Sequence, residues 1–159
     1  MWYNTTTRQK NNNILEDLIM GTIRHALDIA TRAHKNQIDK AGKSYIEHPK
    51  AVANLLDSTK AKIVALLHDV VEDTPWTLDD LRREGFDLEI IAAVDAITKR
   101  PGEANKDYLE RVKVNKLATE VKLKDLEHNS SPDRMAQLER EIQANLKKKY
   151  DFAREFLLV

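Results

Sequence analysis

Hydrophobic residues recur at helical spacing along most of the chain. From Ile14 to His34, apolar residues return every three or four positions, which is the spacing of one face of a helix. Alternating β-branched runs are scarce, and Gly and Pro number only four each. The same helical spacing returns in seven further segments: 48–56, 60–73, 77–85, 87–98, 106–114, 117–126 and 133–158. The pattern predicts an all-α fold, a single bundle of roughly eight helices.

Polar and helix-breaking residues divide these segments. The segment 35–47 is polar and contains a Gly, so we expect a loop, and Pro49 is well placed to open the next helix. Pro75 ends the third helix, and a cluster around Pro132 precedes the last. The first 13 residues are polar, so we expect a flexible N-terminal tail over 1–13 and one domain over 14–159.

Composition and charge narrow the class of protein. Lys plus Arg equal Asp plus Glu at 26 each, so no basic excess indicates a nucleic-acid partner. No segment is long and apolar enough to predict a membrane span. The absence of Cys excludes disulfides, thiolate metal sites and a Cys nucleophile, and it suits a reducing cytosol, so we predict a cytoplasmic protein. The sequence leaves the oligomeric state open.

An apolar run near the middle of the chain carries the strongest candidate chemistry. Residues 66–74 read LLHDVVEDT, in which Glu72 and Asp73 follow His68 and Asp69 at a spacing of four residues. On a helix, this spacing stacks each residue of the second pair over one residue of the first. Buried carboxylates are costly unless they are paired or hold a metal, and no Lys or Arg separates these. The stretch indicates a cation site, with a solvated helix end as the alternative.

Two residues elsewhere could complete a metal site with this stretch. His48 lies at the predicted start of a helix, and Asp125 lies near the end of an apolar helical segment. With His68 and Asp69 they offer two imidazoles and two carboxylates, a donor set that suits Mn, Fe, Zn or Co better than Ca. A metal there would lower the pKa of a bound water and neutralise a phosphoryl group. The two acids one turn further on could orient or deprotonate that water, or bind a second metal.

The other histidines have no clear assignment as ligands. His34 lies late in the first helix, where packing or capping is favoured over metal ligation. His25 is expected on the surface or as core filler, and the role of His128 stays open. The basic run 147–149 is interpreted as the solvated face of the last helix rather than a nucleic-acid patch.

Five motifs together resemble one known family. They are AH-x-x-Q from residue 33, YIEHP from 45, LLHDVVEDT from 66, ITK from 97 and VKLKD-x-x-HN from 121. In this order they are similar to the HD-domain hydrolase of the RelA/SpoT group, and most similar to the stand-alone small alarmone hydrolases such as metazoan SpoT homologues. A His-Asp pair alone would be weak evidence, whereas the ordered set is specific.

The resemblance implies a reaction and a role for each matching residue. Residues 14–159 would form an HD-type metal-dependent phosphohydrolase domain that removes the 3′-pyrophosphate of guanosine 3′,5′-bis(diphosphate)-type alarmones, giving GDP or GTP and pyrophosphate. The metal, usually Mn²⁺ with other divalent transition metals as alternatives, would be held by His48, His68, Asp69 and Asp125. Glu72 and Asp73 would activate the water. The small-molecule nucleotide would contact Lys40, Lys99, Arg111 and Asn129.

Two departures from the family pattern concern the substrate. The family usually has Arg-Lys before YIxHP, with the Arg stacked on the base, whereas this chain has Asp39-Lys40. The usual LADRLHNMR is LKDLEHNSS here. The base, guanine or adenine, is therefore open, and an adenine alarmone or another nucleotide of the HD superfamily is an alternative substrate. A second alternative is a non-catalytic helical nucleotide-binding module, against which the retained Glu72 and Asp73 argue.

Overall fold

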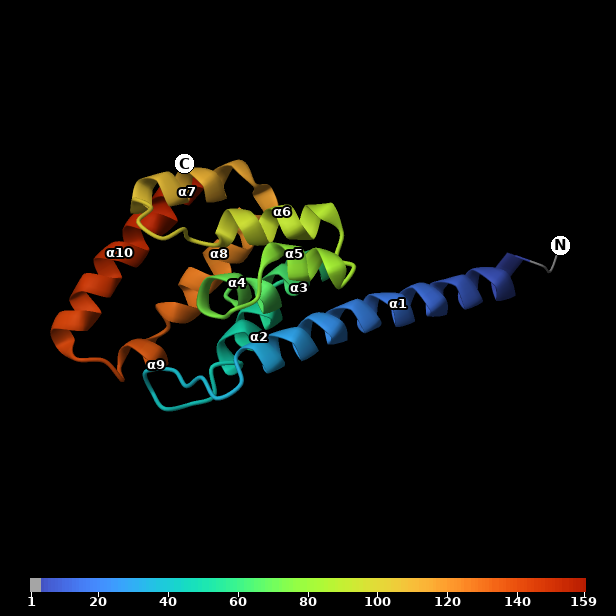
Figure 1. The fold of residues 1–159 in the computed structure, drawn as a ribbon, viewed down its shortest axis with the longest axis horizontal. Helices are drawn as coiled ribbons and strands as arrows, with labels where there is room; N and C mark the ends of the chain where they lie inside the picture. Colours follow the sequence, from blue (N-terminus) through green and yellow to red (C-terminus); the bar gives the residue numbers. More distant parts are fainter. Residues whose placement is uncertain (1–3) are drawn as a thin grey trace.

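The structure, a computed structural model, describes residues 4–159, except for the side chains of residues 4–8, 17 and 19–21 (Figure 1). Within that range the chain is helical, with one isolated antiparallel bridge between Ile38 and Ser44. The all-α prediction is confirmed. The helices are α1 (Asn4–Ala33), α2 (Glu47–Asn54), α3 (Thr59–Leu67), α4 (Val70–Asp73), α5 (Leu78–Arg83), α6 (Leu88–Ile97), α7 (Asn105–Val114), α8 (Lys116–Asn129), α9 (Pro132–Met135) and α10 (Arg140–Leu158).

Two of the eight predicted helices are each divided in two. The segment 60–73 breaks after Leu67, where the His68 ring Nδ1 lies 2.6 Å from the carbonyl oxygen of Ala65. In an unbroken helix that carbonyl accepts from the amide four residues on, so the side chain competes for it. The segment 133–158 divides at 136–139, where Glu139 adopts an extended backbone before α10. Residues 4–159 therefore contain ten helices.

The N-terminal boundary of the first helix also differs from the prediction. Helix α1 begins at Asn4 rather than Ile14, because no Gly or Pro interrupts residues 4–13. Its N-terminal half extends away from the other helices (Figure 1) and leaves Ile14, Leu15 and Leu18 exposed. Residues 1–3 lie outside the described residues, and the flexibility expected of residues 1–13 stays a prediction.

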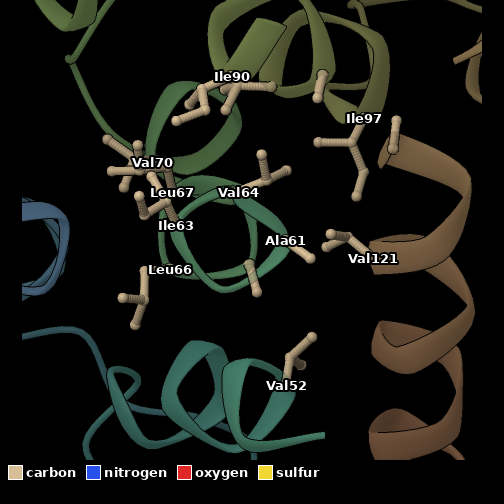
Figure 2. Close-up of a cluster of buried hydrophobic side chains, with 14 of the residues drawn as sticks. Val52, Ala61, Ile63, Val64, Leu66, Leu67, Val70, Ile90, Ile97 and Val121 are labelled. Atoms are coloured by element: carbon tan, nitrogen blue, oxygen red, sulfur yellow. The ribbon is translucent and has the colours of Figure 1, made fainter. Parts of the chain in front are cut away.

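Helix α3 lies at the centre of the core. Every residue from Ala61 to Leu67 except Lys62 is buried, and an apolar surface on all sides is typical of a helix enclosed by others. Figure 2 shows α3 surrounded by Val52 of α2, Ile90 and Ile97 of α6, and Val121 of α8. The end of α3 is therefore held rigidly, and that end carries the His-Asp pair.

Helix α8 runs beside α3 and exposes its last turn to a cleft. Helices α2 and α10 also pack against α8, so residues distant in the sequence line this cleft together. Among the described residues, no helix combines the length and apolar character needed to cross a membrane.

Candidate metal centre and active-site cleft

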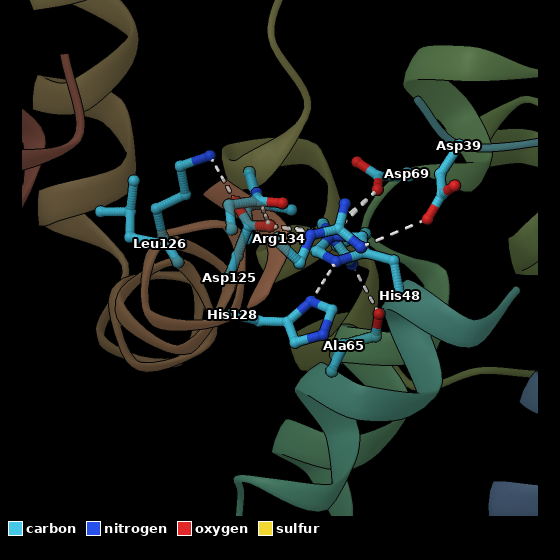
Figure 3. Close-up of polar contacts among 12 residues, drawn as sticks. Asp39, His48, Ala65, Asp69, Asp125, Leu126, His128 and Arg134 are labelled. Atoms are coloured by element: carbon cyan, nitrogen blue, oxygen red, sulfur yellow. Dashed lines mark hydrogen bonds and ion pairs between the residues drawn. The ribbon is translucent and has the colours of Figure 1, made fainter. Parts of the chain in front are cut away.

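Four side chains from three segments of the chain converge at one point, and Figure 3 labels three of them, His48, Asp69 and Asp125. His48 lies in the first turn of α2, His68 and Asp69 join α3 to α4, and Asp125 lies in α8. His48 Nε2 is 3.0 Å from Asp125 Oδ1, and His68 Nε2 is 3.1 Å from Asp69 Oδ2. His48 Nε2 is also 3.8 Å from Asp69 Oδ2, and His68 Nε2 is 3.5 Å from Asp125 Oδ1. The structure thus brings together the four residues that the sequence predicted as metal ligands.

Each imidazole uses its Nδ1 for a hydrogen bond away from the cluster, and its Nε2 lies toward the carboxylates. His68 Nδ1 donates to the Ala65 carbonyl, 2.6 Å away, and His68 Nε2 is buried without a hydrogen-bond partner among the described residues. His48 Nδ1 lies 2.7 Å from Nδ1 of His128, so one of these nitrogens donates to the other. If His48 donates, its Nε2 lone pair faces the carboxylates. An outer hydrogen bond of this kind orients an imidazole for metal binding.

The charges of the cluster also favour a cation. Burial tends to raise the pKa of Asp69, but His68 outweighs it and lowers that pKa to about 2. Burial acts in the same way on Asp125, yet Lys122 and the histidines hold its pKa well below the usual range. Burial lowers the pKa of His68, but the two carboxylates outweigh it and raise that pKa well above the usual value. Both carboxylates are therefore ionised, and metal binding would release the His68 proton.

Three neighbours orient the carboxylate ligands. Lys122 Nζ donates to Asp125 Oδ2 at 2.7 Å, and Asn129 Nδ2 donates to Asp125 Oδ1 at 2.8 Å. The hydroxyl of Tyr45 donates to Asp69 Oδ2 at 2.6 Å. These bonds fix the carboxylates as a metal site requires. Sequence reasoning missed Lys122, whose only signal was its place three residues before Asp125 on a helix.

Glu72 and Asp73 lie beside the cluster on the short helix α4. Glu72 Oε1 accepts from the backbone amide of Lys99 at 2.5 Å. The backbone carbonyl of Asp73 accepts from Gln37 Nε2 at 3.1 Å, and Gln37 Oε1 lies 2.8 Å from His34 Nδ1. His34 therefore lies outside the four-ligand cluster and supports α4 through Gln37. Burial, followed by the charge of Asp69, raises the pKa of both acids, which suits a group that accepts a proton.

The cluster lies in a cleft with two adjacent cavities that share part of their lining, here called the inner and the outer cavity. The inner cavity, about 240 Å³, is lined by His48, Asp69, Asp125 and both acids of α4. Its wall also carries Lys99, Lys122 and Lys149. Burial, followed by the charges of Lys99 and Lys122, lowers the pKa of Lys149. The outer cavity is about 650 Å³. Four residues line both cavities: Tyr45, Asn129, Arg134 and Tyr150.

Three of the four residues predicted to contact the substrate line the cleft, and one does not. Lys99 and Asn129 line the inner cavity, and Lys40 lines the outer one. Arg111 lines neither cavity. Its guanidinium forms two bonds of 2.7 Å to Glu103 and reaches backbone carbonyls of residues 95, 96 and 98. Arg111 therefore stabilises the loop between α6 and α7, and the structure does not bring it to the cleft.

Comparison with known proteins identifies the family. The family model described as an HD domain matches residues 26–126, so the chain belongs to the HD-domain family. This family implies divalent metal binding, and His48, His68 and Asp125 offer ligand atoms within 4.8 Å of one another.

Individual relatives narrow the comparison to the RelA/SpoT group. A GTP pyrophosphokinase of Streptomyces coelicolor is 36% identical over 132 residues, which are 75% of this chain and 16% of that protein. A guanosine-3′,5′-bis(diphosphate) 3′-pyrophosphohydrolase of Haemophilus influenzae is 41% identical over 75 residues, 45% of this chain and 11% of that protein. The chain thus spans a small part of these relatives.

A solved structure has the same fold. It is described as a metazoan ortholog of SpoT that hydrolyzes ppGpp and plays a role in starvation responses. The TM-score is 0.68 at 19% identity, over 86% of this chain and 83% of that one. The resemblance to the RelA/SpoT group expected from the motifs is confirmed.

Proposed function

We propose that this chain is a Mn²⁺-dependent hydrolase that removes the 3′-pyrophosphate from guanosine 3′,5′-bis(diphosphate)-type alarmones. The observation that carries the proposal is the convergence of two histidines and two carboxylates at the base of a cleft, with two further acids beside them. The 3′-pyrophosphohydrolase of Haemophilus influenzae and the SpoT ortholog support the substrate class.

The metal would be held by His48, His68, Asp69 and Asp125, where it would polarise the phosphoryl group and lower the pKa of a bound water. Glu72 and Asp73 accept the proton of the attacking water, since burial and Asp69 raise their pKa values. The bond between the ribose 3′ oxygen and its phosphorus breaks. The 3′ oxygen takes up a proton, and pyrophosphate leaves carrying the oxygen of water.

The lysines of the inner cavity oppose the charge of the departing pyrophosphate. Lys99 and Lys149 line the same cavity as Glu72, and the Lys122 ammonium is already bound to Asp125. Preorganised cations stabilise charge that develops on the leaving group. Lys122 would therefore act chiefly on the ligand Asp125, while Lys99 and Lys149 remain available to the phosphates.

The test uses the full chain loaded with Mn²⁺ and incubated with guanosine or adenosine 3′,5′-bis(diphosphate). We expect pyrophosphate and the nucleoside 5′-diphosphate in equal amounts, measured by anion-exchange chromatography. Glu72→Gln should lower kcat by about 10²- to 10⁴-fold while metal binding is retained. Glu110→Gln is the matched control, because Glu110 is exposed on α7 and lines neither cavity.

The same two substrates also decide whether the protein hydrolyses the guanine or the adenine alarmone. The adenine alarmone stays the alternative because Asp39 stands where the family usually has Arg. Release of pyrophosphate from adenosine 3′,5′-bis(diphosphate) alone would support that alternative. Release of single phosphates would indicate a different nucleotide hydrolase of the HD superfamily, and no release from either compound would reject both alarmone readings.

A further inference from the structure

Arg134 lies where the two cavities of the cleft meet, and its charge has no role in the reaction described above. It comes from the short helix α9 and lines both cavities. Its one ion pair among the described residues joins Nη1 to Asp39 Oδ2 over 3.5 Å (Figure 3). Because a guanidinium has five N–H donors in a fixed plane, most of them remain available to a ligand.

Asp39 is itself fixed, so the ion pair gives the guanidinium a defined position. Asp39 Oδ1 accepts from the amides of Ala41 and Lys43 at 2.8 and 2.9 Å, in a turn where Gly42 has a φ of +76°. Its other oxygen faces Arg134. The side chain of Asp39 is 11% exposed. The loop before α2 therefore holds Arg134 at the outer cavity, which Asp39 and Arg134 both line.

The start of α9 is anchored independently. Arg154 of α10 donates to Ser130 Oγ at 3.1 Å, and Ser130 is the C-cap residue that follows α8. Pro132 opens α9, where its fixed φ suits the first helical position. The backbone that carries Arg134 is thus tied to α8 and α10, while its side chain is tied to the loop.

The sizes of the two cavities indicate what Arg134 meets. Sites for drug-sized ligands are about 300–1,000 Å³, so the inner cavity of about 240 Å³ is too small for a whole nucleotide. A bound nucleotide with phosphates on both sides of its ribose would place one phosphate group at the metal cluster. Its remainder would extend past Arg134 into the outer cavity, which is about 650 Å³.

We infer that Arg134 is a specificity-determining residue that binds the second phosphate group of the substrate, the one that is not hydrolysed. This inference rests on the proposed function for the orientation of the nucleotide. A guanidinium suits phosphate oxygens because two parallel N–H groups can bind two oxygens at once. Asp39 positions this cation through one contact, and the remaining N–H donors of Arg134 favour a ligand with a second anionic group over one without.

The test compares two substrates that differ only at the 5′ position: guanosine 3′,5′-bis(diphosphate) and guanosine 3′-diphosphate with a free 5′ hydroxyl. For Arg134→Gln we expect KM to rise roughly 10- to 100-fold for the first and to stay within about twofold for the second. We expect kcat to be unchanged for both. Arg134→Lys should recover part of the loss, because it keeps the charge without the planar fork.

Asp39→Asn tests the positioning role of the ion pair, since it keeps an oxygen for the two loop amides and removes the charge. It should raise KM for the bis(diphosphate) by less than Arg134→Gln does. Arg140→Gln is the control, because Arg140 is exposed at the start of α10 and lines neither cavity. An equal rise of KM for both substrates, or no rise for either, would overturn the inference.

Calorimetric binding to metal-loaded protein separates this inference from the proposed function. If the wild type hydrolyses neither compound but binds the bis(diphosphate) more tightly, and Arg134→Gln abolishes that preference, the role of Arg134 is supported and the reaction is rejected. If hydrolysis is observed while Arg134→Gln changes neither KM nor the binding preference, the reaction is supported and the role of Arg134 is rejected.

Discussion

At the scale of single residues, His128 is the clearest example of a side chain that acts through another. Its Nδ1 lies 2.7 Å from Nδ1 of His48, and the two rings stack at 5.0 Å. Burial and the charge of His48 lower the pKa of His128 to about 4, so His128 is neutral at pH 7 and can accept the proton of His48. This bond occupies His48 Nδ1, so the other ring nitrogen, Nε2, is the one that lies among the carboxylates of the cluster.

We expect His128→Ala to weaken metal binding by about 10- to 100-fold, because outer hydrogen bonds of ligating histidines are typically worth that much. The dissociation constant can be measured by competition with a coloured chelator. His25→Ala is the matched control, because His25 is half-buried and paired with Glu84 at 3.0 Å. Equal affinities for His128→Ala and wild type would show that His48 needs no such partner.

Glu72 gives a prediction about pH. Burial and then the charge of Asp69 outweigh the Lys99 amide bond and raise its pKa. The folded protein therefore holds this proton more tightly than the unfolded chain. The Glu72 contribution to the free energy of unfolding consequently falls as pH rises from the unfolded pKa through the folded one. A divalent cation at the four ligands opposes the charge of Asp69, so its binding should lower the Glu72 pKa.

Carbon-13 NMR titration of the side-chain carboxyl groups can measure this shift with and without saturating Zn²⁺, which is diamagnetic. Glu110 serves as the internal reference, since it is exposed on α7. A Glu72 pKa that does not move when metal is added would show that Glu72 is electrostatically independent of the cluster.

The residues of the site differ in how far the sequence could predict them. The four ligands and two acids could be selected because HDVVEDT and its partner motifs have defined types and spacing. The contacts of His128 and Arg134 depend on which segments become neighbours, and no local pattern records that. The same limitation applies to Arg111, since its pairing with Glu103 removes it from the cleft. Lys122 reaches Asp125 within one helix, but a spacing of three residues does not by itself distinguish this pair from an ordinary surface ion pair.

At the scale of elements, α3 supplies the rigid base of the site. Leu67, its last residue, is fully buried and immediately precedes His68. We expect Leu67→Ala to lower the free energy of unfolding by about 2–5 kcal/mol, through lost burial and the cavity left behind. Urea denaturation followed by circular dichroism would measure it. Leu88→Ala is the control, because Leu88 is 79% exposed and its loss should cost no more than about 0.5 kcal/mol.

The helices themselves could largely be predicted from periodicity, while their interruptions could not. Helix α6 starts and ends within one residue of the predicted 87–98, since Asp87 caps its first turn by accepting from the amide of Ile90 at 3.0 Å. The break after Leu67 depends on the bond between His68 and the Ala65 carbonyl, which hydrophobic spacing does not record. Glu72 and Asp73 follow this division, on α4, and line the inner cavity.

At the scale of the whole molecule, the metal cluster joins three parts of the chain that are far apart in sequence. Residues 48, 68 and 125 belong to α2, to the end of α3 and to α8. A metal that binds only the folded state stabilises it by RT ln(1 + [L]/Kd), about 2.7 kcal/mol at a metal concentration of 100 Kd. We therefore expect removal of metal by a chelator to lower Tm by several degrees, and readdition of Mn²⁺ to restore it.

Two variants test whether this stabilisation depends on the predicted ligands. His48→Gln removes an imidazole that faces both Asp69 and Asp125, so the increase in Tm on adding Mn²⁺ should be lost. Glu72→Gln should keep that increase, because its carboxylate is bound to the Lys99 amide and does not belong to the group of His48, His68 and Asp125. Differential scanning calorimetry at several Mn²⁺ concentrations would measure both. If Glu72→Gln also lost the increase, Glu72 would be a metal ligand. The assignment of metal binding to the four ligands alone, and of proton transfer to Glu72 and Asp73, would then be wrong.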